Sequence, residues 1–360
     1  MIKVGITNIK KEELNVLREN SPKQISYCNI KPAECGFDGF YFFPKKLDVD
    51  LIESTLPCIT PHQSNIQVLR SIVFSFEMPG VDFDRKKKLD FWRKMVLRKE
   101  CKKVILESKA VYNFMTGSAK YFGGYYAKIR DKEILRKATV VYPAVKHLKY
   151  NKKEHDRVNI LFKSNSFYKD GGEQVLNAFL KLKKQYDNLN LMIISKDIEK
   201  GKGSYTSVNH NKLIAEIKKN KSIVLNPDEK IAFEKADIFA KPTTKDHEGF
   251  SLIEPMNHGL PVISTDFLSI PEIVENNKEG LLIKIMNYNY TLHDYRNKLI
   301  LSKGLSKYLE KETYSRLKRL VEDKKLRSRL GRNANKKVKT RFSFEKRNKI
   351  MKKIYEEAVK

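Results

Sequence analysis

Residues 241–283 read KPTTKDHEGFSLIEPMNHGLPVISTDFLSIPEIVENNKEGLLI. Short apolar runs at Ile238–Ala240 and Pro261–Ser264 enclose a glycine, Gly249, and a helix expected over about Leu252–His258. Strand, turn, helix and strand in this order are typical of a parallel sheet with crossover helices. Gly249 lets the chain turn closely, so the helix presents free N–H groups at its start above the sheet. That edge is where doubly wound folds bind nucleotides, and an anion such as a diphosphate fits there.

Two carboxylates, Asp246 and Glu254, flank this turn with seven residues between them. We expect one to face the sugar end of a ligand and the other, inside the first helical turn, to accept hydrogen bonds from ribose hydroxyls. Carboxylates suit this task because each one accepts paired hydrogen bonds from neighbouring hydroxyls. The alternative is that Glu254 only places negative charge at the start of the helix.

This segment resembles the acidic-x7-acidic signature of the retaining GT-B glycosyltransferases (family 4-like, group 1), roughly E-x-F-G-x-x-x-x-E-A-M-A-x-G-x-P-V-I. Asp246 through the Pro261-Val-Ile segment aligns without a gap, and the blocks Pro271–Val274, Gly280–Ile283 and Leu326–Glu345 resemble the blocks that follow in the family. The resemblance covers about 155–360. It implies an α/β protein of the GT-B fold, in which two Rossmann-like domains face each other across a cleft.

The resemblance implies transfer of a sugar from a nucleoside diphosphate sugar, of the UDP or GDP type, to an acceptor glycan, lipid or protein. The anomeric configuration is retained, no metal or other cofactor is required, and the departing phosphate helps to deprotonate the acceptor. Glu254 then lies on the ribose and Asp246 on the sugar. The expected phosphate-binding amides are those of Gly249, Phe250, Ser251 and Leu252. The first acidic residue is Asp where the family has Glu, and Glu248 offers a competing assignment.

A second block, Phe162 to Gly172, resembles the strand–loop–helix in which a basic pair holds the donor diphosphate. Lys163 and Lys169 keep the spacing of that pair, but Asp170 occupies the place next to Gly171 where the family has lysine. A departing diphosphate builds up negative charge that cations or helix N-termini must stabilise. The alternative for each lysine is a solvated surface side chain.

The N-terminal half resembles the family more weakly, and His62 is its one candidate catalytic residue. Leu56 to Gln63 is similar to the family's segment with a histidine beside the donor sugar, where His62 could donate a hydrogen bond to a hydroxyl or phosphate. The alternative is a loop histidine with no role. The glycine pair that the family has after its first strand is missing after Thr7, so we expect a remodelled acceptor region.

The segment Asp84–Lys103 is dense in Lys and Arg around an apolar stripe that includes Trp92, Met95 and Val96. It could rest on an anionic membrane, or it could be a crossover helix that buries its apolar side and exposes a basic face; both can hold together. The candidate contacts with a membrane or polyanion are Arg85, Lys86, Lys87, Lys88, Arg93 and Lys94.

The net charge of +29 and the sequence pI of about 9.7 favour polyanionic partners but say nothing of the fold. A nucleic-acid-binding protein is therefore one rival interpretation, although no zinc finger, RRM signature or basic zipper is present and no specific nucleic acid is expected. Another rival is the DxD at Asp82–Asp84, a pattern of metal-dependent glycosyltransferases that also arises easily by chance.

Length and composition suit two globular domains: the chain has 360 residues, of which 41% are hydrophobic. We expect a cytoplasmic protein, peripheral to a membrane at most, because no apolar run approaches the roughly 18 residues of a membrane span. The four cysteines lack metal-site spacing, which favours reduced thiols. The expected domains are 1–150 on the acceptor side, 151–341 for the donor, and a C-terminal helix over 342–360 that packs toward the first domain.

Alternating apolar and amphipathic segments predict the individual elements. The expected strands are Lys3–Thr7, Gly39–Phe43, Cys58–Thr60, Ile72–Phe76, Val104–Leu106, Thr139–Tyr142, Val158–Phe162, Leu189–Ser195, Ile223–Leu225, Ile238–Ala240 and Pro261–Ser264. A polar linker is expected over Lys146–Arg157 and a helix over Gly172–Tyr186. The segment Met286–Leu309 matches nothing in the family.

Overall fold

The computed structural model describes most of the chain. The described residues are 1–7, 11–33, 41–54, 58–59, 66–70, 93–116, 132–152, 156–198, 210–244, 246, 249–285 and 303–360. Contacts divide the chain into two compact units, which we call the first unit (Met1–Ala144 with Phe344–Lys360) and the second unit (Val145–Ser343).

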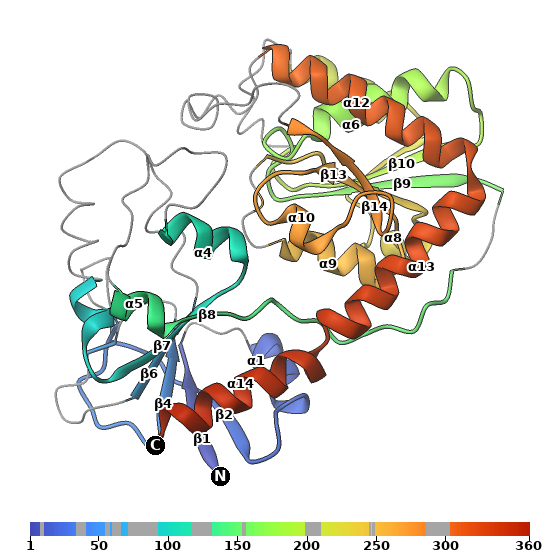
Figure 1. Cartoon of the computed structure of the whole chain (residues 1–360). Helices are drawn as coiled ribbons and strands as arrows, with labels where there is room; N and C mark the ends of the chain where they lie inside the picture. Colours follow the sequence, from blue (N-terminus) through green and yellow to red (C-terminus); the bar gives the residue numbers. More distant parts are fainter. Residues whose placement is uncertain are drawn as a thin grey trace. The chain divides into compact units, whose positions relative to one another are not determined.

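The first unit is built on a parallel sheet of six strands in the order β2-β1-β4-β6-β7-β8 (Figure 1). The strands are β1 (Ile2–Ile6), β2 (Ile25–Asn29), β4 (Leu51–Ser54), β6 (Ile66–Arg70), β7 (Cys101–Leu106) and β8 (Ala138–Val140). A separate parallel pair joins β3 (Tyr41–Phe42) to β5 (Cys58–Ile59). Parallel strands need crossover connections, so both faces of such a sheet become covered by helices.

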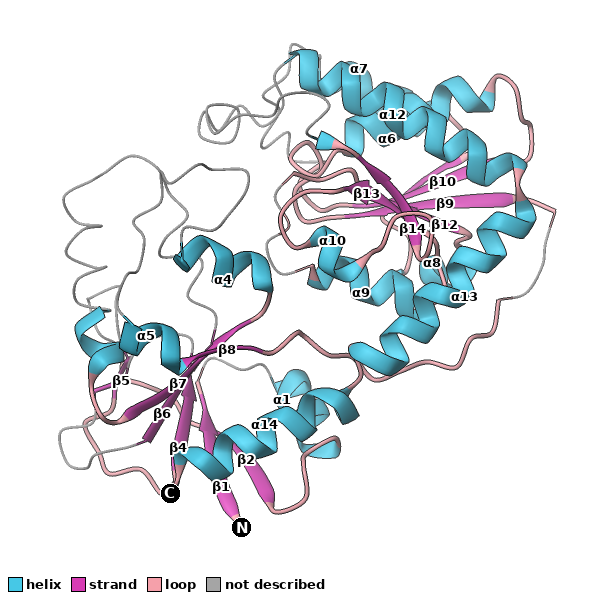
Figure 2. Ribbon diagram, viewed as in Figure 1, coloured by secondary structure: helices cyan, strands magenta, loops and turns pink. Residues whose placement is uncertain are grey.

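Alternate side chains of β7 enter different cores, as the period of two in a strand requires. Ile105 packs in the core formed with α1 (Lys11–Glu19) and α14 (Phe344–Ala358). Its neighbours Val104 and Leu106 pack in the core formed with α4 (Lys109–Thr116) and α5 (Lys132–Lys137). The sheet therefore separates two helix layers (Figure 2).

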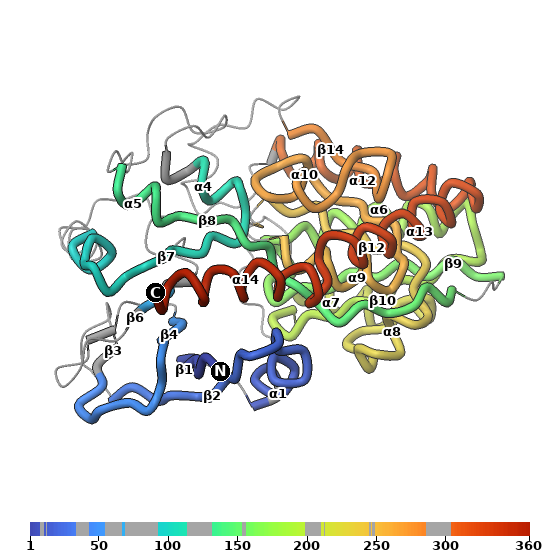
Figure 3. The backbone as a smooth tube through the Cα atoms, turned by 60° about the horizontal axis from the view of Figure 1, so that its bottom comes forward, coloured from blue at the N-terminus to red at the C-terminus, as the bar shows by residue number. Residues whose placement is uncertain are grey.

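The C-terminal helix α14 completes the first unit, although its sequence lies at the far end of the chain. Its apolar residues Met351, Ile354, Tyr355 and Ala358 are buried with Val4 and other strand residues. Figure 3 shows the helix running along β6 and β7. The Tyr355 hydroxyl also donates a hydrogen bond to the buried carboxylate of Glu53, on β4.

The second unit contains a six-stranded parallel sheet in the order β11-β10-β9-β12-β13-β14. The strands are β9 (Val158–Lys163), β10 (Leu189–Ile194), β11 (Ile223–Leu225), β12 (Ile238–Ala240), β13 (Val262–Thr265) and β14 (Gly280–Ile283). Numbered within this unit, the order is 3-2-1-4-5-6, that of the doubly wound dinucleotide-binding fold. The direction of strand addition reverses between β9 and β12, and we call this place the switch point.

Helices cover both faces of this second sheet (Figure 2). One layer contains α6 (Gly172–Lys183), α7 (His210–Lys219) and α12 (Lys303–Glu322). The other contains α8 (Glu229–Lys235), α9 (Phe250–Asn257) and the short α10 (Ile270–Ile273), with α13 (Lys324–Arg341) packed against α9. Strands β12, β13 and β14 are buried on both sides, which explains why Ile238–Ala240 and Gly280–Ile283 appear in the sequence as apolar runs. On edge strand β11, Val224 is exposed.

The sequence predicted the second unit better than the first. Ile223–Leu225 and Ile238–Ala240 are strands with the expected bounds. β9 and β10 differ from their predictions by one residue at one end, and β13 is shifted by one residue at both ends. In the first unit β2, β4 and β6 were not predicted, because half-polar segments such as Ile25–Asn29 give a weak strand pattern. Two expected strands, Gly39–Phe43 and Cys58–Thr60, instead supply the small β3–β5 pair. The expected strand Ile72–Phe76 lies outside the described residues.

The first residues of the expected linker are held in the second unit. Asn257 accepts a hydrogen bond from the Leu148 amide at 2.9 Å and donates one to the Lys146 carbonyl at 2.9 Å. Asn335, on α13, donates to the Leu148 carbonyl at 2.9 Å. These contacts place the unit boundary at Ala144.

Three further observations concern membrane-spanning helices, cysteine thiols and possible metal ligands. No helix within the described residues is long and apolar enough to cross a membrane. Of the described cysteine side chains, Cys28 and Cys101 are free thiols, and burial raises the pKa of Cys101 to about 11. In the part of the chain that the structure describes, no three His, Cys, Asp or Glu side chains are grouped as metal ligands would be.

Replacing Tyr355 by Phe should destabilise the first unit by about 1–3 kcal/mol, because it leaves the buried Glu53 carboxylate without that donor. Tyr27→Phe is the matched control: its buried hydroxyl has no hydrogen-bond partner among the described residues, and its ring packs edge-on against Tyr355. We expect Tyr27→Phe to be neutral or slightly stabilising. Urea denaturation followed by circular dichroism measures both, and equal effects of the two variants would contradict the assignment.

Candidate active site

The carboxyl ends of β9 and β12 meet at the switch point because the two strands are parallel neighbours. The loop after β9 leads into α6, and the loop after β12 leads into α9. These loops touch: a Cβ added to Gly171, whose φ is +81°, would lie 2.6 Å from Cγ of Pro242. The two sequence blocks predicted to bind a donor are therefore brought together at one edge of the sheet.

Lys163 and Glu254, predicted separately, form an ion pair at this edge. The Nζ atom of Lys163 lies 2.7 Å from Oε2 of Glu254 and also donates to the carboxylate of Glu229, on α8. Its ammonium group lies 5.1 Å from the centre of the Phe233 ring. Burial lowers the pKa of Lys163, but the hydrogen bonds and charges of Glu229 and Glu254 outweigh burial, so the pKa is raised from its ordinary value. Lys163 is thus a lysine that stays protonated.

The helix that carries Glu254 begins two residues earlier than predicted. α9 starts at Phe250 rather than about Leu252, so Glu254 is its fifth residue and no acidic residue lies in the first turn. The expectation that Glu254 lies inside the first turn is therefore wrong. The alternative, a carboxylate that charges the helix start, fails for the same reason, and the partner of Glu254 is Lys163.

Asp246 closes the turn that leads into α9. Its Oδ1 accepts a hydrogen bond from the Gly249 amide at 2.6 Å, and its Oδ2 accepts one from the Ser251 hydroxyl. Gly249 has φ +71°, and a Cβ there would lie 2.3 Å from Cγ1 of Ile273, so a side chain cannot be accommodated. Both carboxylate oxygens of Asp246 are thus occupied in shaping the turn.

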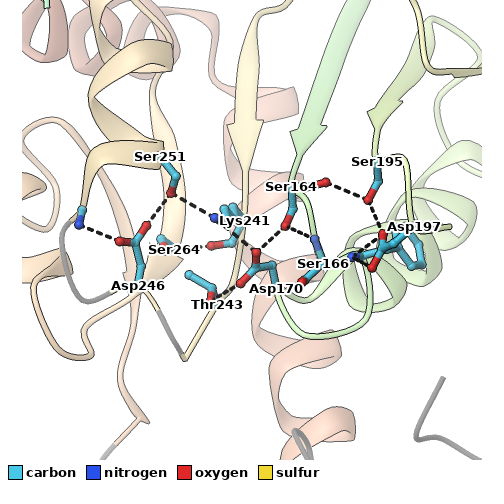
Figure 4. Close-up of polar contacts among 12 residues, drawn as sticks. Ser164, Ser166, Asp170, Ser195, Asp197, Lys241, Thr243, Asp246, Ser251 and Ser264 are labelled. Atoms are coloured by element: carbon cyan, nitrogen blue, oxygen red, sulfur yellow. Dashed lines mark hydrogen bonds and ion pairs between the residues drawn. The ribbon is translucent and has the colours of Figure 1, made fainter. Parts of the chain in front are cut away.

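Polar contacts continue from Ser251 across the switch point to the loop after β9 (Figure 4). Nζ of Lys241, the residue after β12, lies 3.0 Å from Oγ of Ser251 and 3.3 Å from Oδ2 of Asp170. Asp170 accepts further hydrogen bonds from the hydroxyls of Ser164 and Thr243, the latter at 2.6 Å. The side chains of Lys241 and Asp170 are 8% and 15% exposed, so this ion pair is largely removed from water.

Two of the four amides expected to bind phosphate are already in use. The Gly249 amide donates to Asp246, and the Leu252 amide donates to the Gly249 carbonyl at 3.0 Å. The amides of Phe250 and Ser251 have no acceptor among the described residues. With respect to the described residues, the start of α9 therefore has two N–H groups available to an anion, together with the positive end of the helix dipole.

The remaining predicted residues fall into two groups. Lys169 is partly exposed and has no polar partner among the described residues, and Arg93 and Lys94 are exposed while their neighbours Met95 and Val96 are buried. The other predicted positions lie outside the described residues, and they are His62, Glu248, Arg85, Lys86, Lys87, Lys88 and the Asp82–Asp84 pair. Of Met286–Leu309, residues 303–309 belong to α12 and the rest lie outside the described residues.

Sequence reasoning missed Lys241 and Glu229 altogether, and it noted Asp170 only as a departure from the family. One signal for Lys241 was present: a charged residue directly follows the apolar strand Ile238–Ala240 at the carboxyl edge of the sheet. No local pattern marks Glu229, because only the packing of α8 beside β9 brings it to Lys163.

Solved structures share this fold at low sequence identity. A glycosyltransferase from Rickettsia africae has a TM-score of 0.62 and 14% identity, with 99% of this chain and 98% of that chain covered. HepE from Anabaena, in complex with UDP and glucose, has a TM-score of 0.61 and 12% identity over 98% and 99% of the two chains. TarM from S. aureus, in complex with UDP, Fondaparinux and alpha-GlcNAc-glycerol, has a TM-score of 0.57 and 15% identity over 85% and 55%. These likenesses confirm the predicted GT-B architecture.

Sequence comparison identifies the family. No curated protein sequence gives a significant match to the chain. The family model for glycosyl transferases group 1 matches residues 146–337, more than half of the chain, and spans the whole switch point. The predicted membership of group 1 is confirmed: this chain belongs to the group 1 glycosyltransferases.

Proposed function

We propose that the protein transfers a sugar from a nucleoside diphosphate donor, of the UDP or GDP type, that binds at the switch point of the second unit. The observation that carries this proposal is the contact of Lys163 with Glu254 beside the start of α9. The switch point of a doubly wound sheet is the usual place for a nucleotide. Of the similar structures, those of HepE and TarM contain UDP, which supports testing uridine first.

The contact between Lys163 and Glu254 places a cation and a carboxylate close together. The ribose hydroxyls and the first phosphate of a nucleotide are only a few covalent bonds apart, so a carboxylate that binds the ribose and a cation that binds the phosphate are expected near each other. Nζ of Lys163 and Oε2 of Glu254 are 2.7 Å apart. In this proposal the arriving nucleotide takes over both partners, because the ribose hydroxyls donate to Glu254 and the phosphate accepts from Lys163.

We propose further that protein cations and helix amides, rather than a metal ion, stabilise the diphosphate as it leaves. The amides of Phe250 and Ser251 are unused by the described residues, and Lys163 stays protonated. Hydrogen-bond donors aimed at developing charge in a site of low dielectric lower the barrier to transfer.

Retention of the anomeric configuration completes the proposal. The bond from C1 of the sugar to the phosphate oxygen breaks, and a bond from C1 to the acceptor oxygen forms on the same face. The acceptor's proton goes to an oxygen of the departing phosphate, so no carboxylate nucleophile is needed. The engagement of both Asp246 oxygens by Gly249 and Ser251 argues against a free carboxylate nucleophile at this residue. The place of Asp246 beside the sugar stays a prediction. His62 stays a prediction for the acceptor side.

Binding of the donor should raise the melting temperature, because a ligand that binds only the folded state stabilises it. We expect a shift from either UDP or GDP, unchanged by EDTA, and none from ADP. A thermal-shift panel of the three diphosphates, with Mg²⁺ or EDTA, measures this. No shift from any nucleotide would contradict the proposal and favour the rival function, in which the charge of +29 serves binding to an anionic membrane or nucleic acid without transfer.

Glu254→Gln should weaken binding of the nucleotide and also of its phosphate-free nucleoside, by about ten- to a hundredfold, because hydrogen bonds from the ribose to a charged acceptor are lost. Glu310→Gln is the matched control, since Glu310 pairs with Lys181 in a comparable ion pair between α6 and α12. Calorimetric titration with UDP and uridine, or GDP and guanosine, measures both variants. Unchanged nucleoside binding by Glu254→Gln would exclude Glu254 from the ribose.

The anomeric outcome can be read directly from the product. With an α-linked nucleotide sugar as donor and a small hydroxyl-bearing acceptor, we expect an α-linked product, because attack comes from the face that the diphosphate leaves. Proton NMR of the anomeric signal during the first turnovers measures this. A β-linked product would show inversion and would call for a base on the opposite face of the sugar.

A further inference from the structure

Among the described residues, three lysines lie at the carboxyl ends of β9 and β12 or on the loops that follow, and they differ in what they can offer a ligand. Lys163 is held by two carboxylates, those of Glu229 and Glu254. Lys169 is partly exposed to solvent, with no polar partner among the described residues. Lys241 is the buried one, with a side chain only 8% exposed. Burial makes any unused hydrogen-bonding capacity of Lys241 costly, so its partners decide its role.

The ammonium group of Lys241 has three N–H donors, and only two acceptors contact it among the described residues. Its two contacts are with Oγ of Ser251 at 3.0 Å and Oδ2 of Asp170 at 3.3 Å. An ammonium group carries three donor protons, so one of them has no acceptor within the described part of the chain. A buried N–H without an acceptor costs free energy, and an incoming phosphate oxygen would remove that cost.

The surroundings of Lys241 favour a second anion in addition to the Asp170 carboxylate. Lys241 lies between the loop that enters α6 and the start of α9, where the Phe250 and Ser251 amides have no acceptor among the described residues. Both helix starts contribute partial positive charge in addition to the ammonium. Asp170 is the carboxylate that balances Lys241, and it is held in place by donors from Ser164 and Thr243.

We propose that Lys241 donates a hydrogen bond to a phosphate oxygen of the donor, with Asp170 as its fixed counter-charge. Asp170 lies on the loop after β9, and Lys241 lies directly after β12, on the other side of the switch point. Lys241 shares Ser251 with Asp246, so one hydroxyl connects the phosphate-binding cation to the residue proposed for the sugar. This inference rests on the proposed function, because it assigns one contact of the same donor.

The test compares Lys241→Met with the double variant Asp170→Asn/Lys241→Met. Lys241→Met leaves the largely buried Asp170 carboxylate without its cation, which by itself destabilises the folded protein. The double variant removes both charges together, so it keeps the measurement possible if the single variant unfolds. Lys181→Met is the matched control, because it removes a lysine from an ion pair with Glu310 that lies away from the switch point. Circular dichroism and melting temperature establish that each variant is folded.

The measurement is the dissociation constant of whichever of UDP and GDP binds the wild-type protein, with uridine or guanosine as the phosphate-free probe. We expect the double variant to bind the diphosphate about ten- to a hundredfold more weakly and the nucleoside as tightly as the wild type does. Lys181→Met should match the wild type with both probes. Lower affinity for the diphosphate alone would support a contact between Lys241 and phosphate.

Two outcomes would overturn this inference while leaving the proposed function intact. In one, the folded double variant binds the diphosphate with wild-type affinity. In the other, its affinity for the nucleoside falls as much as its affinity for the diphosphate, which would indicate a general distortion of the site. A wild-type protein that binds no nucleoside diphosphate would overturn the proposed function, and the inference with it.

Discussion

The reversal of strand order between β9 and β12 is the constraint on which the candidate site depends. Two parallel strands end side by side there, and a loop leads from each strand into a helix. The loops then approach so closely that Gly171 has no room for a Cβ against Pro242. The close approach brings Lys163, Asp170, Lys241 and Asp246 to one edge from distant parts of the sequence.

Opposite charges alternate across this edge, and the alternation explains how so many ionisable groups can be concentrated there. Lys163 lies between two glutamates, Lys241 beside Asp170, and Asp246 against the amide of Gly249 and the hydroxyl of Ser251. A charge in a partly buried site requires a partner or a hydrogen bond, because removal from water is otherwise expensive. In the proposed function a nucleotide exchanges partners within this network, because the phosphate takes the place of Glu254 beside Lys163 and the ribose hydroxyls donate to Glu254 in place of Lys163.

The positive charge of the chain lies on helix α13 as well as in the basic segment Asp84–Lys103. Helix α13, Lys324–Arg341, contains no acidic residue, and Lys325, Arg332 and Lys336 are exposed on it. Leu326, Leu330 and Val338 of the same helix are buried. An amphipathic helix can therefore carry a basic outer face and still pack on a core, as Arg93 and Lys94 do beside Met95 and Val96. The composition gives the net charge of the chain, and the packing of the helices determines where the charged side chains are exposed.

The amino-acid sequence alone was enough to predict the class of the fold and the edge of the sheet at which the candidate site lies. Apolar runs such as Ile238–Ala240 specify buried parallel strands, and the segment Asp246–Glu254 marks the turn into a helix, because these signals act between residues close in the chain. Only the tertiary structure decided that Glu254 faces Lys163 and that Lys241 pairs with Asp170. It also decided that α14 completes the first unit. Such pairings join residues far apart in the sequence, and they depend on strand order and helix packing that no local periodicity encodes.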